Sequence, residues 1–275
     1  MHSTIIDPDR PAVRLDDVTV VRSGRTVLDG FSLDIPPGRV TAVLGPSGSG
    51  KTTVLKLITG QLAPAAGTVT IGRTDVHALG RSALNDLRRH IGVLLQKGAL
   101  LTDLTVFDNV ALPLREHTAL PESLIRRVVL LKLQAVGLRG AAGLYPGQLS
   151  GGMNRRVAMA RALALDPDLV LYDEPFAGLD PISLAAGARL IKQINRVLGI
   201  TSVVITHDVA VVEDFADHAC IIANGRVVAQ GHPRDLHESD DPLVRQFVDG
   251  LPDGPVPFHY PADDLTDDLL GSDDR

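Results

Sequence analysis

The most informative eight residues of the sequence are Gly45-Pro46-Ser47-Gly48-Ser49-Gly50-Lys51-Thr52. They match the pattern G-x-x-x-x-G-K-[ST], which is typical of a phosphate-binding loop. Glycines let the backbone bend so that successive N–H groups point inward at phosphate oxygens. The Lys51 ammonium would then pair with the β- and γ-phosphates, and the Thr52 hydroxyl would bind Mg²⁺. The next residue, Thr53, is also expected to bind the nucleotide.

The residues on either side of this loop fit the same interpretation. Residues 40–44 are apolar and rich in β-branched side chains, so a buried strand would enter the loop. Residues 52–58 have a helical pattern that is closed by Gly60. The positive end of that helix would face the phosphates. The sequence therefore predicts a nucleoside triphosphate site between a strand and a helix.

Composition limits the class of protein. The 275 residues suit one large domain, or one domain with an inserted lobe. The net charge is −6 and no long basic patch occurs, which argues against nucleic acid as the main partner. The single cysteine, Cys220, excludes an internal disulfide and a cysteine-built zinc site, and its apolar neighbours predict a buried thiol.

Hydropathy argues against a membrane-embedded chain. No stretch reaches about 18 consecutive apolar residues, the length that a membrane span needs. Residues 1–11 are polar and do not form a signal peptide. We therefore expect a cytoplasmic chain that contacts a membrane only through partners.

The first ninety-six residues predict strands around the phosphate-binding loop. Residues 13–35 and 68–71 read as short strands with turns, which indicates an antiparallel β patch. A helix is expected at residues 82–89, with Ser82 as its N-cap. A buried strand over residues 91–95 then ends at Gln96.

The rest of the chain changes pattern twice. From residue 97 to about 165, helical segments replace strands, and we interpret this part as an inserted helical subdomain. Strand and helix then alternate to about residue 235, which indicates a parallel sheet. The predicted fold class is therefore α/β, with a phosphate-loop core, an antiparallel β subdomain and a helical subdomain.

Two acids follow a buried strand. The run Leu169-Val170-Leu171-Tyr172 precedes Asp173 and Glu174. In a phosphate-loop enzyme, Asp173 would bind Mg²⁺, and Glu174 would orient or deprotonate the water that attacks the γ-phosphate. Alone, such a pair is often only a solvated strand end; the phosphate-binding loop in the same chain is what favours chemistry.

A second phosphate-binding position is predicted at Ser150-Gly151-Gly152. The two glycines would expose N–H groups at the start of a helix over residues 153–165, and Ser150 would add a hydroxyl. One chain with two such positions suggests two copies that face each other. Each ATP would lie between the phosphate-binding loop of one copy and Ser150 of the other.

The ordered set of motifs resembles the nucleotide-binding subunit of an ABC transporter, over about residues 12–245. The resemblance rests on residues 45–52 (Walker A), Gln96 (Q-loop), residues 149–153 (signature motif), residues 171–174 (Walker B), residues 178–180 (D-loop) and His207 (switch histidine). It implies a RecA-like P-loop NTPase core, with the helical subdomain inserted at about residues 97–165, that hydrolyses ATP with Mg²⁺.

The resemblance also implies roles for three residues that their surroundings alone do not assign. Gln96 would sense and ligate Mg²⁺ and couple to the membrane subunit. Asp180 would cross the dimer interface, and His207 would contact the γ-phosphate. Read singly, Gln96 could be a polar strand end, and His207 a structural histidine after the apolar run 203–206.

Several further segments are similar to the MlaF subfamily, whose members power phospholipid movement between the inner and outer membranes of Gram-negative bacteria. They are residues 96–101, 106–110, 113–117, 172–176 and 253–258. This similarity implies an MlaE-like permease, an MlaD-like MCE protein and an MlaB-like STAS protein as partners. It places the chain on the cytoplasmic side of the inner membrane, as a peripheral homodimeric subunit, with residues 246–275 as a C-terminal tail.

Two departures from the ABC pattern stand out. The signature motif ends in Met153 where glutamine is usual. In addition, residues 18–22 contain none of the aromatic side chains on which ABC ATPases usually stack adenine. We expect Val20 or Arg22 to cover the base instead, which predicts weak selectivity between ATP and GTP.

The tail has two readings. Residues 249–275 contain eight aspartates and one Lys or Arg, as a disordered solubilising tail would. The segment Pro257-Phe258-His259-Tyr260-Pro261 instead favours docking on a neighbouring subunit, because a solvated tail gains little from exposed aromatic rings.

Three other functions compete with phospholipid transport. The first is an ABC importer subunit for a small polar solute. The second is a non-transport ABC ATPase on ribosomes or DNA, against which stand the acidic balance and the lack of a long coiled-coil insertion. The third is a stand-alone P-loop kinase or switch GTPase, which would not need the second phosphate position at Ser150.

Overall fold

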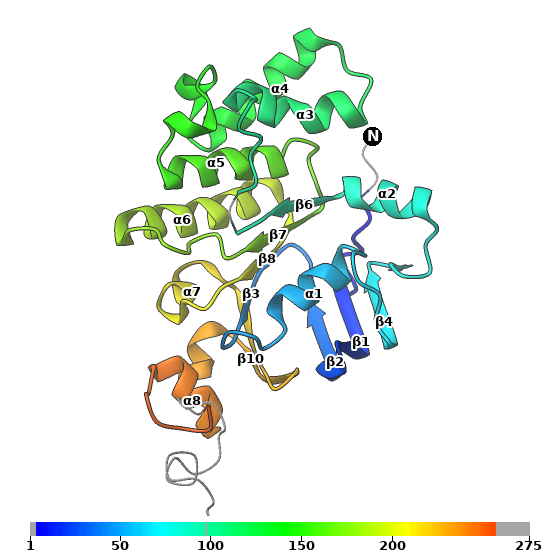
Figure 1. Cartoon of the computed structure of the whole chain (residues 1–275), viewed down its shortest axis with the longest axis vertical. Coiled ribbons are helices and arrows are strands. Elements are labelled where there is room, and N and C mark those ends of the chain that lie inside the picture. Colours follow the sequence, from blue (N-terminus) through cyan, green and yellow to red (C-terminus); the bar gives the residue numbers. More distant parts are fainter. Residues whose placement is uncertain (1–3, 97, 257–275) are drawn as a thin grey trace, which may run out of the picture.

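The central sheet has six strands in the spatial order β10-β9-β3-β8-β7-β6 (Figure 1). In this computed structural model, which describes residues 4–96 and 98–256, neighbouring strands are parallel except for the antiparallel pair β9 and β10. The bounds are β3 Val40–Leu44, β6 Ile91–Leu94, β7 Leu169–Asp173, β8 Thr201–Ile205, β9 His218–Ala223 and β10 Arg226–Gly231. Strands β3 and β8 are buried throughout, because both faces of the sheet are covered.

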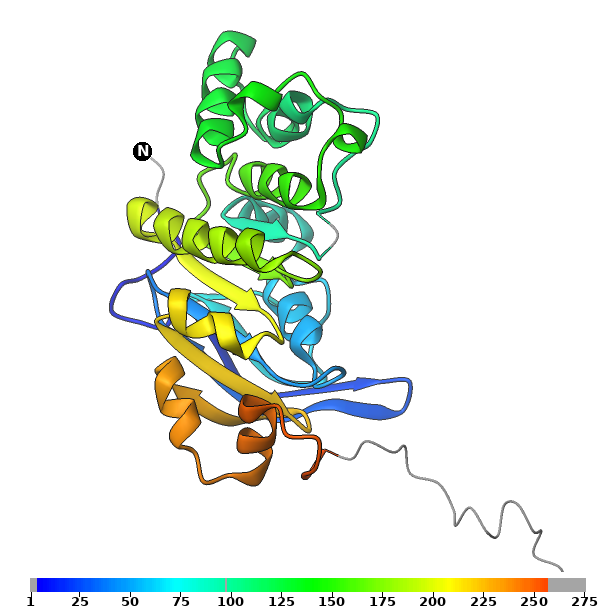
Figure 2. The ribbon, with the colours of Figure 1, turned by 90° about the vertical axis from the view of Figure 1, so that its left-hand side faces the viewer.

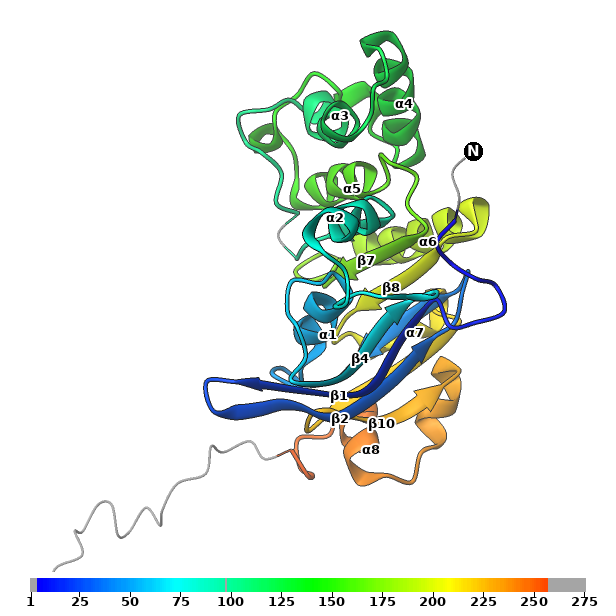
Figure 3. The same ribbon diagram turned by 90° about the vertical axis from the view of Figure 1, so that its right-hand side faces the viewer.

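A second, antiparallel sheet has four strands in the order β2-β1-β4-β5. Its strands are β1 Val13–Arg22, β2 Arg25–Ile35, β4 Ala66–Ile71 and β5 Thr74–Asp75. The short strands predicted over residues 13–35 merge into two long ones, joined by a turn in which Ser23 and Gly24 have φ of 50° and 74°. The resulting β1–β2 hairpin projects past the body of the molecule (Figure 3).

Helix α1 (Lys51–Ile58) lies between the two sheets. Its buried residues Val54, Leu57 and Ile58 share one core cluster with side chains of both sheets. The opposite face of the central sheet packs on α6 (Pro181–Leu198) and α7 (Val209–Phe215) in a second cluster. The α/β core with an antiparallel β subdomain is as predicted.

Helices α3, α4 and α5 come between β6 and β7 in the chain and form a separate lobe above the sheets (Figures 1 and 2). Their bounds are α3 Val106–His117, α4 Glu122–Ala135 and α5 Gly151–Ala162, with 3-10 turns at Arg139–Ala141 and Pro146–Gln148. The inserted helical part is therefore as predicted, although α5 ends at Ala162, three residues before the expected end at residue 165.

The remaining elements are α2 (Arg81–Arg89), a 3-10 helix at Pro233–Glu238 and α8 (Pro242–Asp249). The prediction that Ser82 caps α2 is wrong. The N-cap is Gly80, in extended conformation and without a side-chain bond, and Ser82 lies inside the first turn. The prediction that Cys220 is buried is confirmed.

Two expectations concern the chain ends. The segment Pro257–Pro261, predicted to dock on a neighbour, lies outside the described residues. Among the residues that are described, every helix is too short or too polar to cross a membrane.

The contact between α5 and β6 depends on a glycine. A Cβ at Gly92 in β6 would lie 2.5 Å from the carbonyl oxygen of Ala162, the last residue of α5. We expect Gly92→Ala to lower the free energy of unfolding by about 1–3 kcal/mol, because the helix must move away. Denaturant titration measures this effect.

The matched control is Gly140→Ala, where an added Cβ would have no atom of the described residues 4–96 and 98–256 within 4 Å. We expect it to change the free energy of unfolding by no more than about 0.5 kcal/mol. Equal effects of the two substitutions would contradict the proposed packing.

Candidate functional site

The predicted site residues of the core gather at the carboxyl ends of three adjacent parallel strands. The phosphate-binding loop follows β3, Asp173 ends β7 and Glu174 follows it, and His207 comes two residues after β8. This edge is where open α/β sheets bind ligands. The strand order therefore brings together residues that are up to 162 positions apart, from Gly45 to His207.

The loop over residues 45–52 is confined on two sides. Gly45 has φ of 144°, and a Cβ there would lie 2.1 Å from the carbonyl oxygen of Ile222, at the end of β9. Gly50 has φ of 106°, and its Cβ would lie 2.8 Å from Leu28 Cδ2 on β2. Only glycine fits either position, so the backbone itself forms the wall of the loop.

Lys51 points back into its own loop. Its ammonium donates hydrogen bonds to the carbonyl oxygens of Gly45 at 2.7 Å and Pro46 at 2.9 Å. Burial lowers the pKa of Lys51, while the nearby carboxylates of Glu174 and Asp173 oppose that shift. The Lys51 ammonium therefore lies in a partly desolvated position between the loop carbonyls and the two carboxylates.

The hydroxyls of the loop differ in exposure. Ser47 and Thr52 are exposed, whereas Ser49 and Thr53 are buried. Among the residues that the structure describes, the buried Ser49 hydroxyl has no hydrogen-bond partner. A phosphate group fits this set, because the glycine cradle excludes side chains, a cation lies beside it and a hydroxyl lacks a partner. The exposed Thr52 hydroxyl and the Asp173 carboxylate are ligands that suit Mg²⁺.

Glu174 and His207 form a hydrogen-bonded pair. Glu174 Oε2 lies 2.9 Å from His207 Nδ1, with the glutamate side chain 13% exposed and the histidine 63% exposed. The Glu174 N–H donates to the carbonyl oxygen of Ile205 at 2.9 Å, and its φ is 47°. A non-glycine residue in this conformation is uncommon and turns the chain sharply away from the strand. The histidine can therefore orient the carboxylate.

Asp173 is less well stabilised as an anion. Burial raises its pKa above the ordinary value, the neighbouring Glu174 raises it further, and Lys51 and Lys56 act in the opposite direction. A cation held there would remove this penalty, which is the behaviour expected of a metal-binding carboxylate.

The second predicted phosphate position lies on the other lobe. Ser150 caps α5 and accepts a hydrogen bond from Met153 N at 3.2 Å. Gly151 and Gly152 form the first helical turn, whose N–H groups have no partner within the helix. Helix α5 stands apart from α1 and the loop before it (Figure 1). Within one copy, the structure does not bring Ser150 to the phosphate-binding loop.

Gln96 faces an open hollow of about 600 Å³, and Asp180 directly follows Leu179, which also lines that hollow. Gln96 is exposed and lines the hollow together with Gly151 of α5 and Gly178. Asp180 is exposed and caps α6, accepting hydrogen bonds from the N–H groups of Ile182 and Ser183 at 3.0 Å. Hydrogen bonds from Ser183, first from its side chain and then from its N–H, lower the pKa of Asp180. The cap was not predicted, although Asp before Pro is a typical helix start.

Sequence reasoning also missed two arginines of α5. Arg155 donates to the carbonyl oxygen of Ala177, and Arg161 to those of Gly98 and Ala99. The sequence does contain a signal for buried arginines, because basic residues flank the apolar run 157–160, which is fully buried in α5. Such residues need a partner inside the protein.

The comparisons with known proteins identify the family. A family model described as ABC transporter matches residues 28–177, more than half of the chain. The chain belongs to the ABC transporter family. This result agrees with the resemblance inferred from the motifs.

Curated relatives within the ABC transporter family cover almost the whole chain. "Intermembrane phospholipid transport system ATP-binding protein MlaF" of Escherichia coli K12 is 52% identical over 94% of this chain and 96% of its own length. MlaF of Haemophilus influenzae is 51% identical over 94% and 98%. "Probable ribonucleotide transport ATP-binding protein mkl" of Mycobacterium leprae is 40% identical over 93% and 74%.

Solved structures of ABC transporter cassettes share the fold. The cbiO1 protein of Clostridium perfringens, part of the transporter complex cbiONQ, superposes with a TM-score of 0.78 at 29% identity, covering 88% of this chain and 96% of that one. A dimeric post-hydrolysis state of the ATP-binding cassette MJ0796, bound to ADP and Pi, has a TM-score of 0.73 at 34% identity, with coverages of 81% and 99%.

The raised pKa of Asp173 predicts how stability changes with pH in this ABC transporter subunit. The folded chain binds a proton at Asp173 more tightly than the unfolded chain, so the penalty is present at neutral pH and disappears as pH falls through the raised pKa. We expect Asp173→Asn to raise the metal-free unfolding free energy at pH 7 by about 0.5–1 kcal/mol, with little gain near pH 4.

The control is Asp180→Asn, which should act in the opposite direction. The pKa of Asp180 is lowered, so its contribution to stability is present above the ordinary aspartate pKa and is lost as pH falls through the lowered value. Thermal unfolding from pH 4 to pH 8 in a chelator compares the two variants. A loss of stability at neutral pH in Asp173→Asn would contradict the argument.

One expectation about the base site is wrong. Val20 is 1% exposed and faces the core, so it cannot cover a nucleotide base; Val21, at 52% exposed, and Arg22 are among the exposed residues near the hairpin turn. The register shift between Leu15 and Val18 adds one residue to β1 and reverses the alternation that would have put Val20 outside.

With Arg22 or Val21 in place of an aromatic ring, we still expect GTP to be hydrolysed at a rate similar to ATP. Arg22→Ala should raise KM for both nucleotides alike, and Arg14→Ala, in the same strand and paired with Asp34, serves as control. Phosphate release measures both rates. An ATP preference above about tenfold, or about 1.4 kcal/mol, would contradict the prediction.

Proposed function

We propose that this chain is the ATP-hydrolysing subunit of an ABC transporter that moves phospholipids between the inner and outer membranes of a Gram-negative bacterium. The observation that carries the proposal is 52% identity over 94% of the chain to a curated MlaF protein. A second MlaF, at 51% identity, supports it. Such a subunit would maintain the lipid asymmetry of the outer membrane.

The nucleotide would be held by the glycine cradle and the first turn of α1. Gly45 and residues 47–50 would supply backbone N–H groups to the phosphates, Lys51 would supply a positive charge, and Thr53 would contact the nucleotide from the first turn of α1. Thr52 and Asp173 would hold Mg²⁺, with Gln96 as a further ligand. The metal would supply charge neutralisation at the β- and γ-phosphates.

The hydrolytic step would use the pair Glu174 and His207. Glu174 would accept a proton from the attacking water, since its carboxylate lies next to the loop and is held by His207 at 2.9 Å. His207, at 63% exposed, would also donate to the γ-phosphate. The side chains of this chain thus orient the water and stabilise the developing charge.

Two copies would complete each site. The phosphate-binding loop and Ser150 lie on different lobes, and a related cassette that is bound to ADP and Pi is dimeric. Ser150, Gly151 and Gly152 of one copy would close on the nucleotide bound to the other, and Asp180 would lie near the interface between them. ATP would then close the dimer, and hydrolysis would open it.

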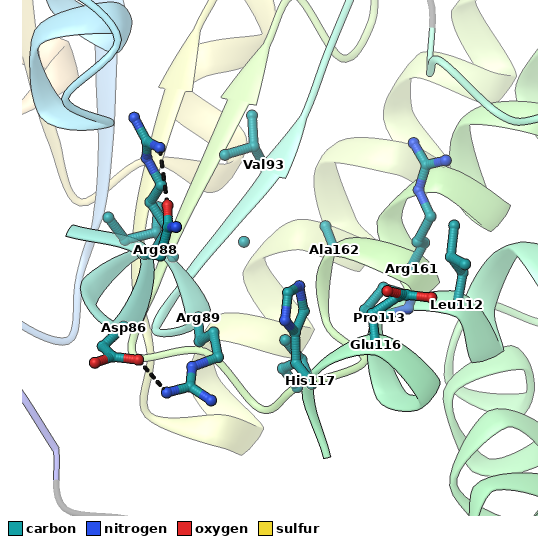
Figure 4. Close-up of a pocket in the computed structure, with 14 residues that line it drawn as sticks. Asp86, Arg88, Arg89, Val93, Leu112, Pro113, Glu116, His117, Arg161 and Ala162 are labelled. Carbon is teal, nitrogen blue, oxygen red and sulfur yellow. Dashed lines mark hydrogen bonds and ion pairs between the residues drawn. The ribbon is translucent and has the colours of Figure 1, made fainter. Parts of the chain in front are cut away.

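A groove between α2 and α3 would receive a cytoplasmic segment of the permease. It has a volume of about 750 Å³, lies beside the edge strand β6, and is lined by Arg89, His117 and Leu112 among others (Figure 4). The partners would be an MlaE-like permease, an MlaD-like MCE protein and an MlaB-like STAS protein. The chain would lie on the cytoplasmic face of the inner membrane.

The role of Glu174 can be tested by substitution. Glu174→Gln removes the proton acceptor but keeps the hydrogen-bonding shape, so we expect turnover to fall by about a hundredfold or more while ATP stays bound. Phosphate release and size-exclusion chromatography with ATP measure the two effects. The control is Glu238→Gln, at an exposed 3-10 helix end. Normal turnover in Glu174→Gln would contradict the assignment.

The transported substrate is tested by purifying the tagged full chain from detergent-solubilised membranes. We expect a permease, an MCE protein, a small STAS protein and phospholipid, identified by mass spectrometry. Recovery of a solute permease without lipid-binding partners would contradict lipid transport but would leave the assignment of ATPase activity unchanged. Ribosomal or DNA-repair partners would contradict transport as a whole.

A further inference from the structure

Three arginines of α5 donate hydrogen bonds to backbone carbonyls of three different segments. Arg155 reaches Ala177, which follows β7. Arg156 reaches Val136, at the end of α4, at 3.2 Å, and Arg161 reaches the segment after β6. Among the described residues, none of the three forms an ion pair with an acid. Burying a guanidinium whose partners are uncharged carbonyl groups carries a desolvation cost, which suggests that these arginines have a role beyond packing of the helix.

Arg161 fixes the segment that follows Gln96. Its Nη2 donates to the carbonyl oxygen of Gly98 at 2.8 Å, and its Nη1 to that of Ala99 at 2.9 Å. Both carbonyls belong to residues with positive φ, 70° and 47°. Burial lowers the pKa of the Arg161 guanidinium, as expected for a charge away from bulk water. The forked guanidinium therefore holds an unusual backbone shape two residues from Gln96.

A second side chain supports the same segment from α3. Asn109 is fully buried, its amide donates to the carbonyl oxygen of Leu101 at 3.0 Å, and its own oxygen accepts from Leu101 N at 2.9 Å. Arg161 also lies 3.5 Å from this oxygen. The segment after Gln96 is thus attached to the helical lobe.

Arg155 fixes the segment that follows Glu174. It donates to the carbonyl oxygen of Ala177, and the Ala177 N–H in turn donates to the carbonyl oxygen of Glu174 at 3.3 Å. Burial lowers the pKa of Arg155 too. One hydrogen-bonded turn therefore separates Arg155 from the residue that is paired with His207.

The spacing of the two arginines lets one helix reach both segments. Arg161 comes six positions after Arg155, which puts the two residues roughly 120° apart around the helix and about 9 Å apart along it. The helix starts at Ser150 and its far end touches β6 at Gly92. A rotation or shift of α5 would move both attached segments together.

We propose that Arg155 and Arg161 are positioning residues that tie the movement of α5 to the segments after Glu174 and Gln96. This rests on the proposed function, in that Ser150 at the start of α5 receives the nucleotide of the second copy. Docking of Ser150 then brings Glu174 and Gln96 into place in the same copy, through two guanidinium groups. The site of one copy therefore hydrolyses ATP only when Ser150 of that copy contacts the nucleotide bound to the second copy.

The test uses the full chain with Arg155→Met and Arg161→Met, and Arg156→Met as the matched control. All three remove an arginine-to-carbonyl bond from the same helix, but Arg156 reaches the end of α4 and neither active-site segment. Phosphate release gives kcat and KM, and thermal unfolding gives Tm. We expect kcat to fall about tenfold in the first two variants, with KM within about twofold of the wild type.

Arg156→Met should keep kcat within about twofold at a Tm no higher than that of the other two variants. Equal kcat in all three variants, or losses that follow Tm, would overturn the proposal. If Arg161→Met does not fold, Arg161→Lys and Arg156→Lys are compared. Lysine keeps the charge but lacks the rigid planar fork with which the Arg161 guanidinium places one donor on each carbonyl, so an intermediate kcat supports the proposal, and a kcat equal to that of Arg156→Lys overturns it.

The outcome is separable from failure of the proposed function. A wild-type chain that hydrolyses no ATP with Mg²⁺ would contradict the ATPase assignment itself. Arginine variants that match the control in an active wild-type background would contradict this inference alone.

Discussion

Close backbone packing around residues 45–50 is the constraint on which the rest of the structure depends. Gly45 lies against the carbonyl of Ile222, Gly50 against Leu28, and Gly225 against Val27, with room for a Cβ at none of them. The loop is therefore wedged between the central sheet and the antiparallel sheet. Both sheets must be in place before the loop has its shape, and helix α1 between them fixes its direction.

The parallel sheet converts this local constraint into a site. Strand β3 is flanked by β8 and β9, and β7 is next to β8, so their carboxyl ends deliver the loop, Asp173 and His207 to one edge. The helical lobe is not part of this edge. It reaches the site through side chains of α5, and Arg155 and Arg161 are long enough to span the gap to the two connecting segments.

Much of this arrangement could be predicted from the sequence, and the reason differs between parts. The loop before α1 is predictable because glycine, lysine and hydroxyl positions are fixed by phosphate chemistry. The buried strands were found because apolar runs such as residues 40–44 are continuous. Alternation failed at Val20, since bulges in β1 change which side chain faces the core. The N-cap of α2 cannot be predicted from residue type, because Gly80, which has no capping side chain, holds that position.

The contacts of the arginines could not be predicted. A side chain with several rotatable bonds can reach any carbonyl within a wide radius, and the carbonyls of Gly98 and Ala177 carry no sequence signal. The pair between Glu174 and His207 is a further example. It depends on the left-handed backbone of Glu174, which no residue type at that position would indicate.

The hydrogen bonds that Lys51 makes inside its own loop bear on how the nucleotide leaves. A phosphate that binds the Lys51 ammonium replaces its hydrogen bonds to the carbonyl oxygens of Gly45 and Pro46, at 2.7 and 2.9 Å. The net binding free energy is therefore only the difference between the new ammonium–phosphate bonds and these internal bonds. The loop regains those internal bonds when the product departs. The two loop carbonyls thus compete with the phosphate for Lys51 and limit the affinity for ADP. Weak product binding is an advantage in an ATPase that must release ADP before each new cycle.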